Sequence, residues 1–142
     1  MFDTLRLPVF AAPMFLVSGP DLVIAACKTG IVGAFPTPNA RTPEQLDDWM
    51  TRIRAEVGDR PWCANLVTHS TNARLADDLA LVAKHRPPVV VTALGSPKPA
   101  VEVVRAYGGR VLADVTTIKL AQKAIQAGAD GLACICAGAG GH

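Results

Sequence analysis

The chain has 142 residues, of which 50% are hydrophobic and only 5% aromatic, and its formal net charge is +2. Its Lys and Arg residues are scattered among acidic ones, which argues against electrostatic binding of nucleic acid or of an anionic membrane. No apolar run reaches the roughly 18 residues of a membrane-spanning helix, so we expect a soluble protein whose partner is a small molecule.

The cysteines give no sign of a metal site. Cys27, Cys63, Cys134 and Cys136 lack the CxxC spacing of zinc-binding motifs, and no secretory signal precedes them. We therefore expect a reduced, cytoplasmic setting and no bound metal. Cys134 and Cys136 are interpreted as buried free thiols, with a redox role for this pair as the alternative.

In chain order, six short apolar runs with the length of buried strands alternate with helix-like stretches. The predicted strands are "PVFAAPM" (8–14), "IVGAF" (31–35), "WCANLV" (62–67), "PVVVTAL" (88–94), "RVLADV" (110–115) and "GLACICA" (131–137). The predicted helices fall in 19–30, 42–59, 70–85, 96–109 and 116–130. In the second helix Thr42 can act as the N-cap and Gln45 can complete a capping box. In the last helix Ile118, Ala121 and Ile125 share one apolar stripe.

The spacing of the strands predicts the fold. Strand starts recur every two to three dozen residues, the period of a βα unit, which leaves an open doubly wound sheet or a barrel. The stretch after the first strand, "AAPMFLVSGP", lacks the GxGxxG of a dinucleotide-binding sheet, so the barrel is favoured. A (β/α)8 TIM barrel typically takes about 250 residues. We therefore predict an α/β fold in which residues 1–142 supply about six βα units, the N-terminal part of a single TIM-barrel domain.

Functional residues of such a barrel gather on the loops after the carboxyl ends of the strands. The candidates there are Ala12, Pro13, Met14, Phe35 to Asn39, Asn65, His69, Gly95, Ser96, Asp114 and the final stretch "AGAGGH" (137–142). The glycines of that final stretch would let the backbone approach a flat or phosphorylated ligand, or would simply form a tight turn.

Two of these candidates have ionisable side chains that suit catalysis or ligand binding. His142 can act as a base near neutral pH, and the alternative is a capping or solvent-exposed histidine. Asp114 can bind a ligand hydroxyl or imide N–H, or can cap the helix that follows it. His69 and His85 are interpreted as structural, because His85 lies at a helix end and His69 in a loop without an evident partner.

Three stretches together resemble the flavin-dependent nitronate monooxygenases, formerly called 2-nitropropane dioxygenases. They are "LPVFAAPMFLVSGPDLVIAACKTGIVGAFPTPNART", "ANLVTHSTNARL" and "AGADGLACICAGAGGH". The resemblance implies an oxidoreductase that uses FMN and O2 to convert nitronates, and in some members nitroalkanes, to a carbonyl compound and nitrite. A homo-oligomer is compatible with it.

The resemblance also implies roles for individual residues. Ala12, Pro13 and Met14 would lie along the FMN ring, Asn65 and Asp114 would be close to the flavin, and the backbone of Ala139, Gly140 and Gly141 would approach it. His142 would be the catalytic base, with Met14 and Phe35 shaping the substrate pocket around it.

The chain departs from the family pattern in three places. Asp114 stands where some members have lysine, and Gly138 where some have glutamate. The last two βα units, whose loops usually bind phosphate in such barrels, are expected to be missing from these 142 residues.

Three other functions remain open from the sequence. One is a flavin-dependent enoyl-acyl-carrier-protein reductase, which shares the glycine-histidine signature and would need reduced nicotinamide. Another is a flavin-free barrel acting on phosphorylated sugars, suggested by "ADVTT" and "AGAD". The third is a non-catalytic half-barrel scaffold that is stable only when paired with another chain.

Overall fold

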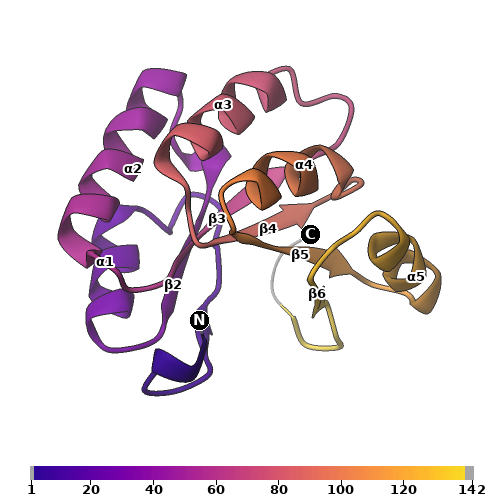
Figure 1. Cartoon of the computed structure of the whole chain (residues 1–142), viewed down its shortest axis with the longest axis horizontal. Coiled ribbons are helices and arrows are strands. Elements are labelled where there is room, and N and C mark those ends of the chain that lie inside the picture. Colours follow the sequence, from indigo (N-terminus) through magenta and orange to yellow (C-terminus); the bar gives the residue numbers. More distant parts are fainter. Residues whose placement is uncertain (1, 140–142) are drawn as a thin grey trace.

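The computed structural model describes residues 2–139 as a single sheet with a layer of helices (Figure 1). The strands are β1 (Phe10–Ala11), β2 (Val32–Pro36), β3 (Trp62–Val67), β4 (Val89–Ala93), β5 (Arg110–Val115) and β6 (Gly131–Cys134). The α-helices are α1 (Pro20–Lys28), α2 (Pro43–Val57), α3 (Leu75–His85), α4 (Lys98–Ala106) and α5 (Ile118–Gln126). Two short 3-10 helices, η1 (Phe2–Thr4) and η2 (Thr37–Asn39), complete the described elements.

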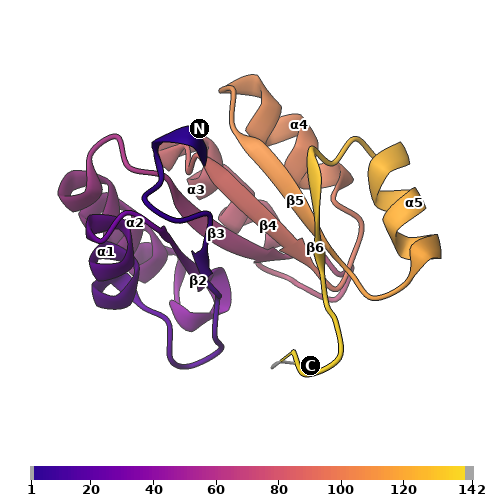
Figure 2. The same ribbon diagram turned by 90° about the horizontal axis from the view of Figure 1, so that it is seen from below.

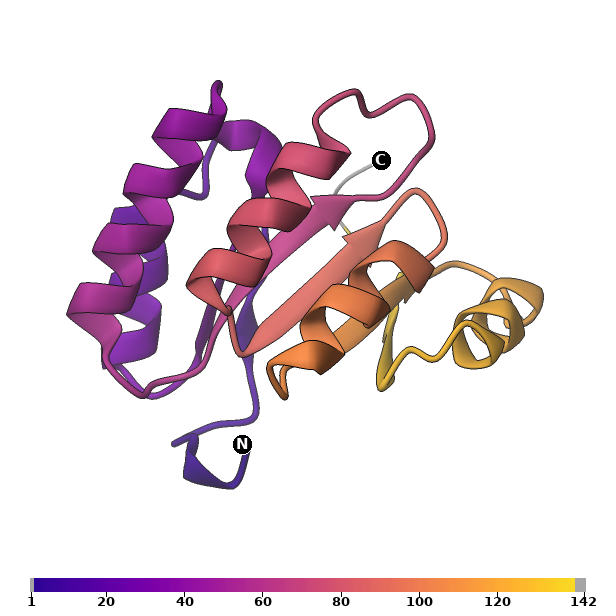
Figure 3. The same ribbon diagram turned by 45° about the horizontal axis from the view of Figure 1, so that its top comes forward.

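The six strands are all parallel and are paired in chain order, from β1 at one edge to β6 at the other. A doubly wound sheet would reverse its strand order part-way, whereas a (β/α)8 barrel keeps the order of the chain. The sheet is curled, with helices along its outer side (Figures 2 and 3). The described residues therefore form the curled, open part of a (β/α)8 barrel, as the strand spacing predicts.

A large core lies between the sheet and the first four helices. Phe35 of β2 and Trp62 of β3 are fully buried there, with ring centroids 6.5 Å apart, and Trp49 of α2 meets Phe35 edge-on at 5.8 Å. Helix α1 approaches β2 closely because position 33 is glycine: a Cβ there would lie 2.4 Å from the carbonyl oxygen of Val23. Burial of apolar area in this layer is the main stabilising contribution to the fold.

A second, smaller core lies on the inner face of the sheet. It contains Val32, Ala34, Cys63, Val89 and Val91, against which Leu5, Phe10 and Leu112 pack. The N-terminal segment thus covers part of the inner face, and the backbone bond from Arg6 N to Gly30 O (2.8 Å) helps to hold it there.

Helix α2 begins as the sequence predicts, with one difference in its cap. Thr42 is the N-cap, and its hydroxyl accepts from Gln45 N at 3.2 Å. The side chain of Gln45 returns to Arg41 N (2.6 Å), one residue earlier than the reciprocal bond of a capping box. Together the two bonds satisfy the backbone N–H groups of Arg41 and Gln45 at the start of α2.

Helix α5 is rotated relative to the predicted apolar stripe. Ala121 of that stripe packs against the core as predicted, but Ile118 is 81% exposed and Ile125 61% exposed. Ala124, outside the predicted stripe, is buried against Ala113 and Val115 of β5. The small alanine side chain lets the helix lie close to the strand, which turns the larger isoleucines outward. No helix within residues 2–139 has the length and apolarity that a bilayer crossing requires.

Candidate functional site

The carboxyl ends of all six strands lie at the same edge of the sheet because the strands are parallel. The loops that follow them are therefore neighbours in space although they are far apart in the sequence. This edge, together with the adjoining inner face of the sheet, holds most of the predicted site residues that the structure describes.

The loop after β1 runs from Ala12 to Gly19 and carries three of these residues. Strand β1 is shorter than predicted, and Ala12, Pro13 and Met14 belong to this loop. Proline has no N–H to give to a strand partner, which is consistent with an early end of the strand. The loop is compact: Met14 N donates to the Ser18 hydroxyl (2.9 Å), and Ser18 N donates to Met14 O (3.0 Å).

Asn65 lies on the inner face of β3, near its carboxyl end. Side chains alternate along a strand, so Asn65 shares the face of Cys63, which belongs to the inner core. It is 7% exposed, and its Nδ2 donates to Val91 O on the neighbouring strand at 3.2 Å. Within residues 2–139 no hydrogen bond to its Oδ1 is recorded. Its amide is therefore held in place with one acceptor available.

Asp114 occupies the same inner face on β5, two residues after Leu112. Its neighbours across the sheet are small: it is in register with Ala133 of β6, and Ala93 of β4 lies on its other side. The side chain is half-buried, and no hydrogen bond or ion pair to it is recorded among the described residues. Burial raises the pKa of the Asp114 carboxyl above its usual range.

Cys63 lies deeper on the inner face and is not a reactive thiol. Burial raises its pKa to about 12, and the nearby charge of Asp114 acts in the same direction. A thiol that does not ionise near neutral pH is a poor nucleophile and a poor metal ligand. Its place next to Asn65 is therefore a packing role.

Phe35 lies on the opposite face of the sheet from Asn65 and Asp114. It is 0% exposed in the core between β2 and the helices, where Trp49 and Trp62 contact it. The structure therefore does not bring Phe35 to the inner face, in contrast to the expectation that it shapes a substrate pocket. Met14, by contrast, is exposed at the carboxyl edge of the sheet.

The glycine-rich stretch after β6 is described only in part. Ala137 and Gly138 form a turn, with φ of +84° at Gly138, and Ala139 N donates to Cys136 O at 3.0 Å. A positive φ is the conformation for which glycine is suited. Gly140, Gly141 and His142 lie outside the described residues.

Cys134 and Cys136 are exposed, which corrects the expectation that both are buried. Cys134 is the last residue of β6, which is an edge strand of the described sheet, so neither residue is enclosed by a further strand there. The two buried cysteines are Cys27 and Cys63. Among the described residues no cluster of three or more His, Cys, Asp or Glu side chains can hold a metal ion.

The other two histidines lie outside the inner face. His85, the last residue of α3, is buried, and its Nε2 pairs with Asp47 Oδ1 of α2. His69 is exposed and bonds the Thr71 hydroxyl at 2.8 Å. Both have local partners, as expected of structural histidines.

Asn39 is the last of the candidates Phe35 to Asn39, and the sequence analysis assigned it no specific role. Asn39, at the end of η2, makes three hydrogen bonds to the loop after β1, with Met14 O, Ser18 O and Leu16 N. Its position after a buried strand is a weak signal, because asparagine is common in turns for purely local reasons.

A hollow of about 280 Å³ lies at the same end of the sheet, between the β4–α4 loop and α5. It is bordered by Gly95, Ser96, Pro97, Ala113, Asp114, Val115, Leu120, Lys123 and Ala124. Ala113 and Val115 face the helices, so the hollow belongs mainly to the helical side of the sheet, and Asp114 is the inner-face residue that also borders it.

No family model and no curated protein matches the chain. Solved structures do. FabK from Thermotoga maritima has a TM-score of 0.80 at 23% identity, over 90% of this chain and 40% of its own. Nitroalkane oxidase from Streptomyces ansochromogenes has a TM-score of 0.80 at 23% identity, over 92% of this chain and 46% of its own.

A mandelate oxidase variant, solved with a C4a-OH-FMN adduct, is more distant, with a TM-score of 0.60 at 19% identity over 90% of this chain and 48% of its own. What these proteins share with the chain is the fold. The chain has the fold of part of a (β/α)8 barrel, and it spans less than half the length of each of these three structures.

Proposed function

We propose that this chain forms the ring-binding face of an FMN-dependent oxidoreductase that oxidises nitronates with O2 to a carbonyl compound and nitrite. The observation that carries the proposal is the arrangement on the inner face of the sheet. Asn65 and the half-buried Asp114, to which the described residues make no hydrogen bond or ion pair, share this face near the carboxyl edge of the sheet, where the loop that contains Met14 also lies.

The residues of this face fit a flat ring. The residues in register with Asn65 are Pro36 and Val91, and the one in register with Asp114 on β6 is Ala133, none of which has a long side chain. A planar ligand can therefore approach the sheet, and the polar groups at its edge can reach the Asp114 carboxyl and Asn65 Oδ1, which accepts no hydrogen bond from the described residues. This combination of a small apolar floor with a few polar groups is typical of cofactor sites.

FMN, when bound, would supply the electron transfer to O2 that no side chain can perform. The chain's own residues would bind and orient. In this proposal Ala12, Pro13 and Met14 lie along one side of the ring, and Asn65 accepts a hydrogen bond from its edge. Asp114 contributes a negative charge next to the ring.

The glycine-rich stretch has two roles in the proposal. The backbone of Ala139, Gly140 and Gly141 approaches the ring, and His142 removes the α-proton of a neutral nitroalkane or holds the charge of a nitronate. Residues 1–142 then belong to one FMN-binding domain of a cytoplasmic enzyme. A homo-oligomer is compatible with this proposal. The choice of substrate rests on the resemblance of the three sequence stretches to nitronate monooxygenases, because the fold is equally similar to that of a nitroalkane oxidase and to that of FabK.

The test is to purify the protein, titrate it with FMN by fluorescence, and supply propyl nitronate in air while O2 uptake and nitrite are measured. The expected result is weak but saturable FMN binding, because the βα units whose loops usually bind phosphate are expected to be missing from these 142 residues. O2 should be consumed and nitrite formed only when FMN is present. Failure to bind FMN, or binding without oxidation of the nitronate, contradicts the proposal.

The same preparation separates the alternatives. NADH-dependent reduction of an enoyl thioester, with no nitronate oxidation, would identify an enoyl-acyl-carrier-protein reductase. Turnover of a phosphorylated sugar without flavin would identify a flavin-free barrel. Loss of cooperative unfolding on dilution, with neither activity, would favour a scaffold that needs a second chain.

A further inference from the structure

We propose that Asn39 is a positioning residue: its side-chain amide fixes the shape of the loop after β1, and thereby the placement of Ala12, Pro13 and Met14 at the carboxyl edge of the sheet. The effect on cofactor binding rests on the function proposed above. The effect on the loop does not, because it follows from contacts within the chain.

The amide of Asn39 uses all its hydrogen-bonding groups on this one loop. Its Nδ2 donates to Met14 O at 3.0 Å and to Ser18 O at 2.8 Å, and its Oδ1 accepts from Leu16 N at 2.9 Å. Asn39 is 9% exposed, so water competes little for these bonds. A backbone loop is thus held at three points by a single side chain from another element.

The loop needs such support because it buries little of itself. Met14, Phe15, Leu16 and Val17 are between 44% and 67% exposed, so hydrophobic burial contributes little to its conformation. Leu16 also has φ of 64°, in the left-handed region that is unfavourable for a residue with a branched side chain. The bond from Leu16 N to Asn39 opposes relaxation of this conformation.

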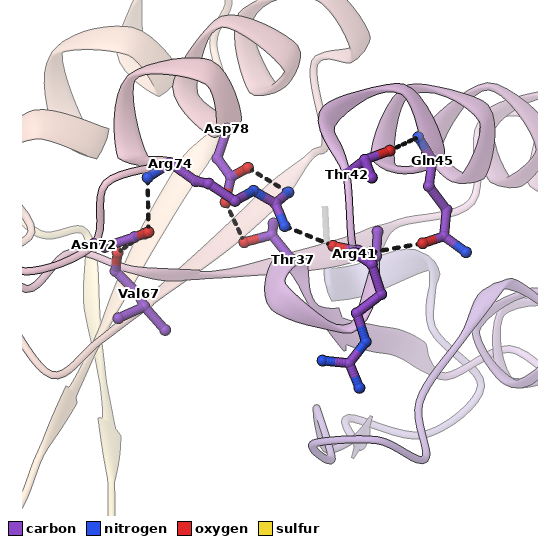
Figure 4. A network of polar contacts seen from close by, with 9 residues as sticks. Thr37, Arg41, Thr42, Gln45, Val67, Asn72, Arg74 and Asp78 are labelled. Carbon is purple, nitrogen blue, oxygen red and sulfur yellow. Dashed lines mark hydrogen bonds and ion pairs between the residues drawn. The ribbon is translucent and has the colours of Figure 1, made fainter.

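Asn39 is held in turn by a buried ionic network, drawn in Figure 4. Thr37, at the start of η2, donates to Asp78 Oδ2 of α3 at 2.7 Å. Arg74 donates from Nη2 to Asp78 Oδ1 at 3.0 Å and from Nη1 to Ala40 O at 2.7 Å. Thr37 and Asp78 are buried, so the chain is fixed two residues before Asn39, at Thr37, and directly after it, at Ala40.

The network continues to the third loop of this edge. Arg74 N donates to Asn72 Oδ1 at 3.1 Å, and Asn72 Nδ2 donates to Val67 O, at the end of β3, at 2.7 Å. The loops after β1, β2 and β3 are therefore joined by side-chain hydrogen bonds, with Asn39 as the connection to the first. Misplacement of a binding loop by about 1 Å can cost a large part of its function.

The experiment compares Asn39→Ala, which removes all three bonds, and Asn39→Asp, which keeps the shape but loses both donors and places an anion beside two carbonyl oxygens. Amide hydrogen exchange of residues 14–18 without cofactor reports on the loop. FMN affinity and the visible spectrum of bound FMN report on its consequence. Thr42→Ala is the control, because it removes one cap bond at the start of α2 without touching the loop.

We expect exchange of the Leu16 amide to rise at least about tenfold in Asn39→Ala, and exchange of the Ser18 amide to rise in both variants. We expect FMN affinity to fall about tenfold in both, with an altered flavin spectrum and a larger effect on KM than on kcat for propyl nitronate. The control should change none of these. If Asn39→Ala does not fold, Asn39→Asp provides the same measurements.

Unchanged exchange in a folded Asn39 variant overturns the inference. So does faster exchange with unchanged FMN affinity and spectrum, because Asn39 would then hold a loop that does not contact the cofactor. If the unaltered protein does not bind FMN, the proposed function fails, and the exchange data still decide whether Asn39 fixes the loop.

Discussion

Asp114 is a half-buried carboxylate whose surroundings differ from those of an ordinary surface carboxylate. It is in register with Ala133, and no described residue makes a hydrogen bond or ion pair to it. Burial favours its neutral form and raises its pKa. A carboxylate held in this way is a cost to the fold at neutral pH, which is typical of a residue retained for binding or chemistry.

Asp114→Asn should therefore stabilise the protein without cofactor at pH 7. The pKa of Asp114 in the folded state lies above its unfolded value of about 3.9, so ionisation above that range disfavours the folded state. The gain should disappear below about pH 4, where Asp114 is protonated in both states. Urea unfolding at the two pH values measures this, with Asp59→Asn, at an exposed turn, as the control.

With FMN bound, Asp114→Asn should also shift the reduction potential or the absorption spectrum of the flavin, because a charge near the ring tunes its electronics. Loss of stability at pH 7 with an unchanged spectrum would instead identify Asp114 as a structural residue.

His142 lies outside the described residues, and its prediction depends on the chemistry of the proposed reaction. A neutral nitroalkane must lose an α-proton before it is oxidised, whereas a preformed nitronate has already lost it. If the enzyme accepts neutral nitroalkanes, His142→Asn should slow them by about 10² to 10⁴, the usual contribution of a positioned base. Nitronate oxidation should fall less, and equal losses with both substrates would mean that His142 is not the base.

At the scale of elements, the contact between α1 and β2 depends on the missing side chain of Gly33. A Cβ at this position would lie 2.4 Å from Val23 O and 2.7 Å from Val23 Cα, both backbone atoms that cannot turn aside. Gly33→Ala should therefore lower the free energy of unfolding by about 1–3 kcal/mol, the usual cost of overpacking. Gly19→Ala is the matched control, since its Cβ would lie 3.7 Å from Trp49, an ordinary contact. Equal urea midpoints for the two variants would show that α1 can move away from β2.

Helices α2 and α3 are joined by Asp47, which accepts from Lys84 Nζ at 2.7 and 2.8 Å and pairs with His85. The hydrogen bond from Lys84, and next that from His85, lowers the pKa of Asp47. A lowered pKa gives stability that is present above the unfolded value of about 3.9 and is lost as pH falls through the folded value.

Asp47→Asn should therefore reduce the loss of stability between neutral and acid pH, measured by urea unfolding across that range. Asp48→Asn, at the exposed neighbouring position, should leave the pH dependence as it is. Parallel curves for the unaltered protein and Asp47→Asn would show that this pair of contacts does not contribute.

At the scale of the whole molecule, cofactor binding and folding should be linked. A ligand that binds only the folded state at 100 times its Kd stabilises it by about 2.7 kcal/mol. In the proposed function the inner face contacts the flavin ring, so both FMN and riboflavin should raise the melting temperature, and inorganic phosphate alone should not. An increase with phosphate as large as with FMN would place the main contact elsewhere.

Much of the architecture could be predicted because it repeats. Six apolar runs separated by capped helical stretches predict parallel strands in chain order, and the structure confirms all six strands and all five helices. The strand ends that carry Asn65 and Asp114 were predictable for the same reason, since the period of a βα unit places every carboxyl end at one edge. The strand "VGAFP" shows where this reasoning fails. All five of its residues are buried, so both faces of the strand are apolar. The sequence pattern therefore does not show which side chains face the helices and which face the inner side of the sheet.

The sequence by itself thus determined the kind of element, the order of the strands and the edge at which function is expected, because these depend on local periodicity and on short-range capping. The tertiary structure decided which way each residue faces. It turned Phe35 toward the helices, rotated α5 so that Ala124 meets the sheet, and left Cys134 exposed at an edge. It also brought Asn39 to a loop some two dozen residues earlier in the chain, a contact that no local pattern encodes because it exists only when the two strand ends lie side by side.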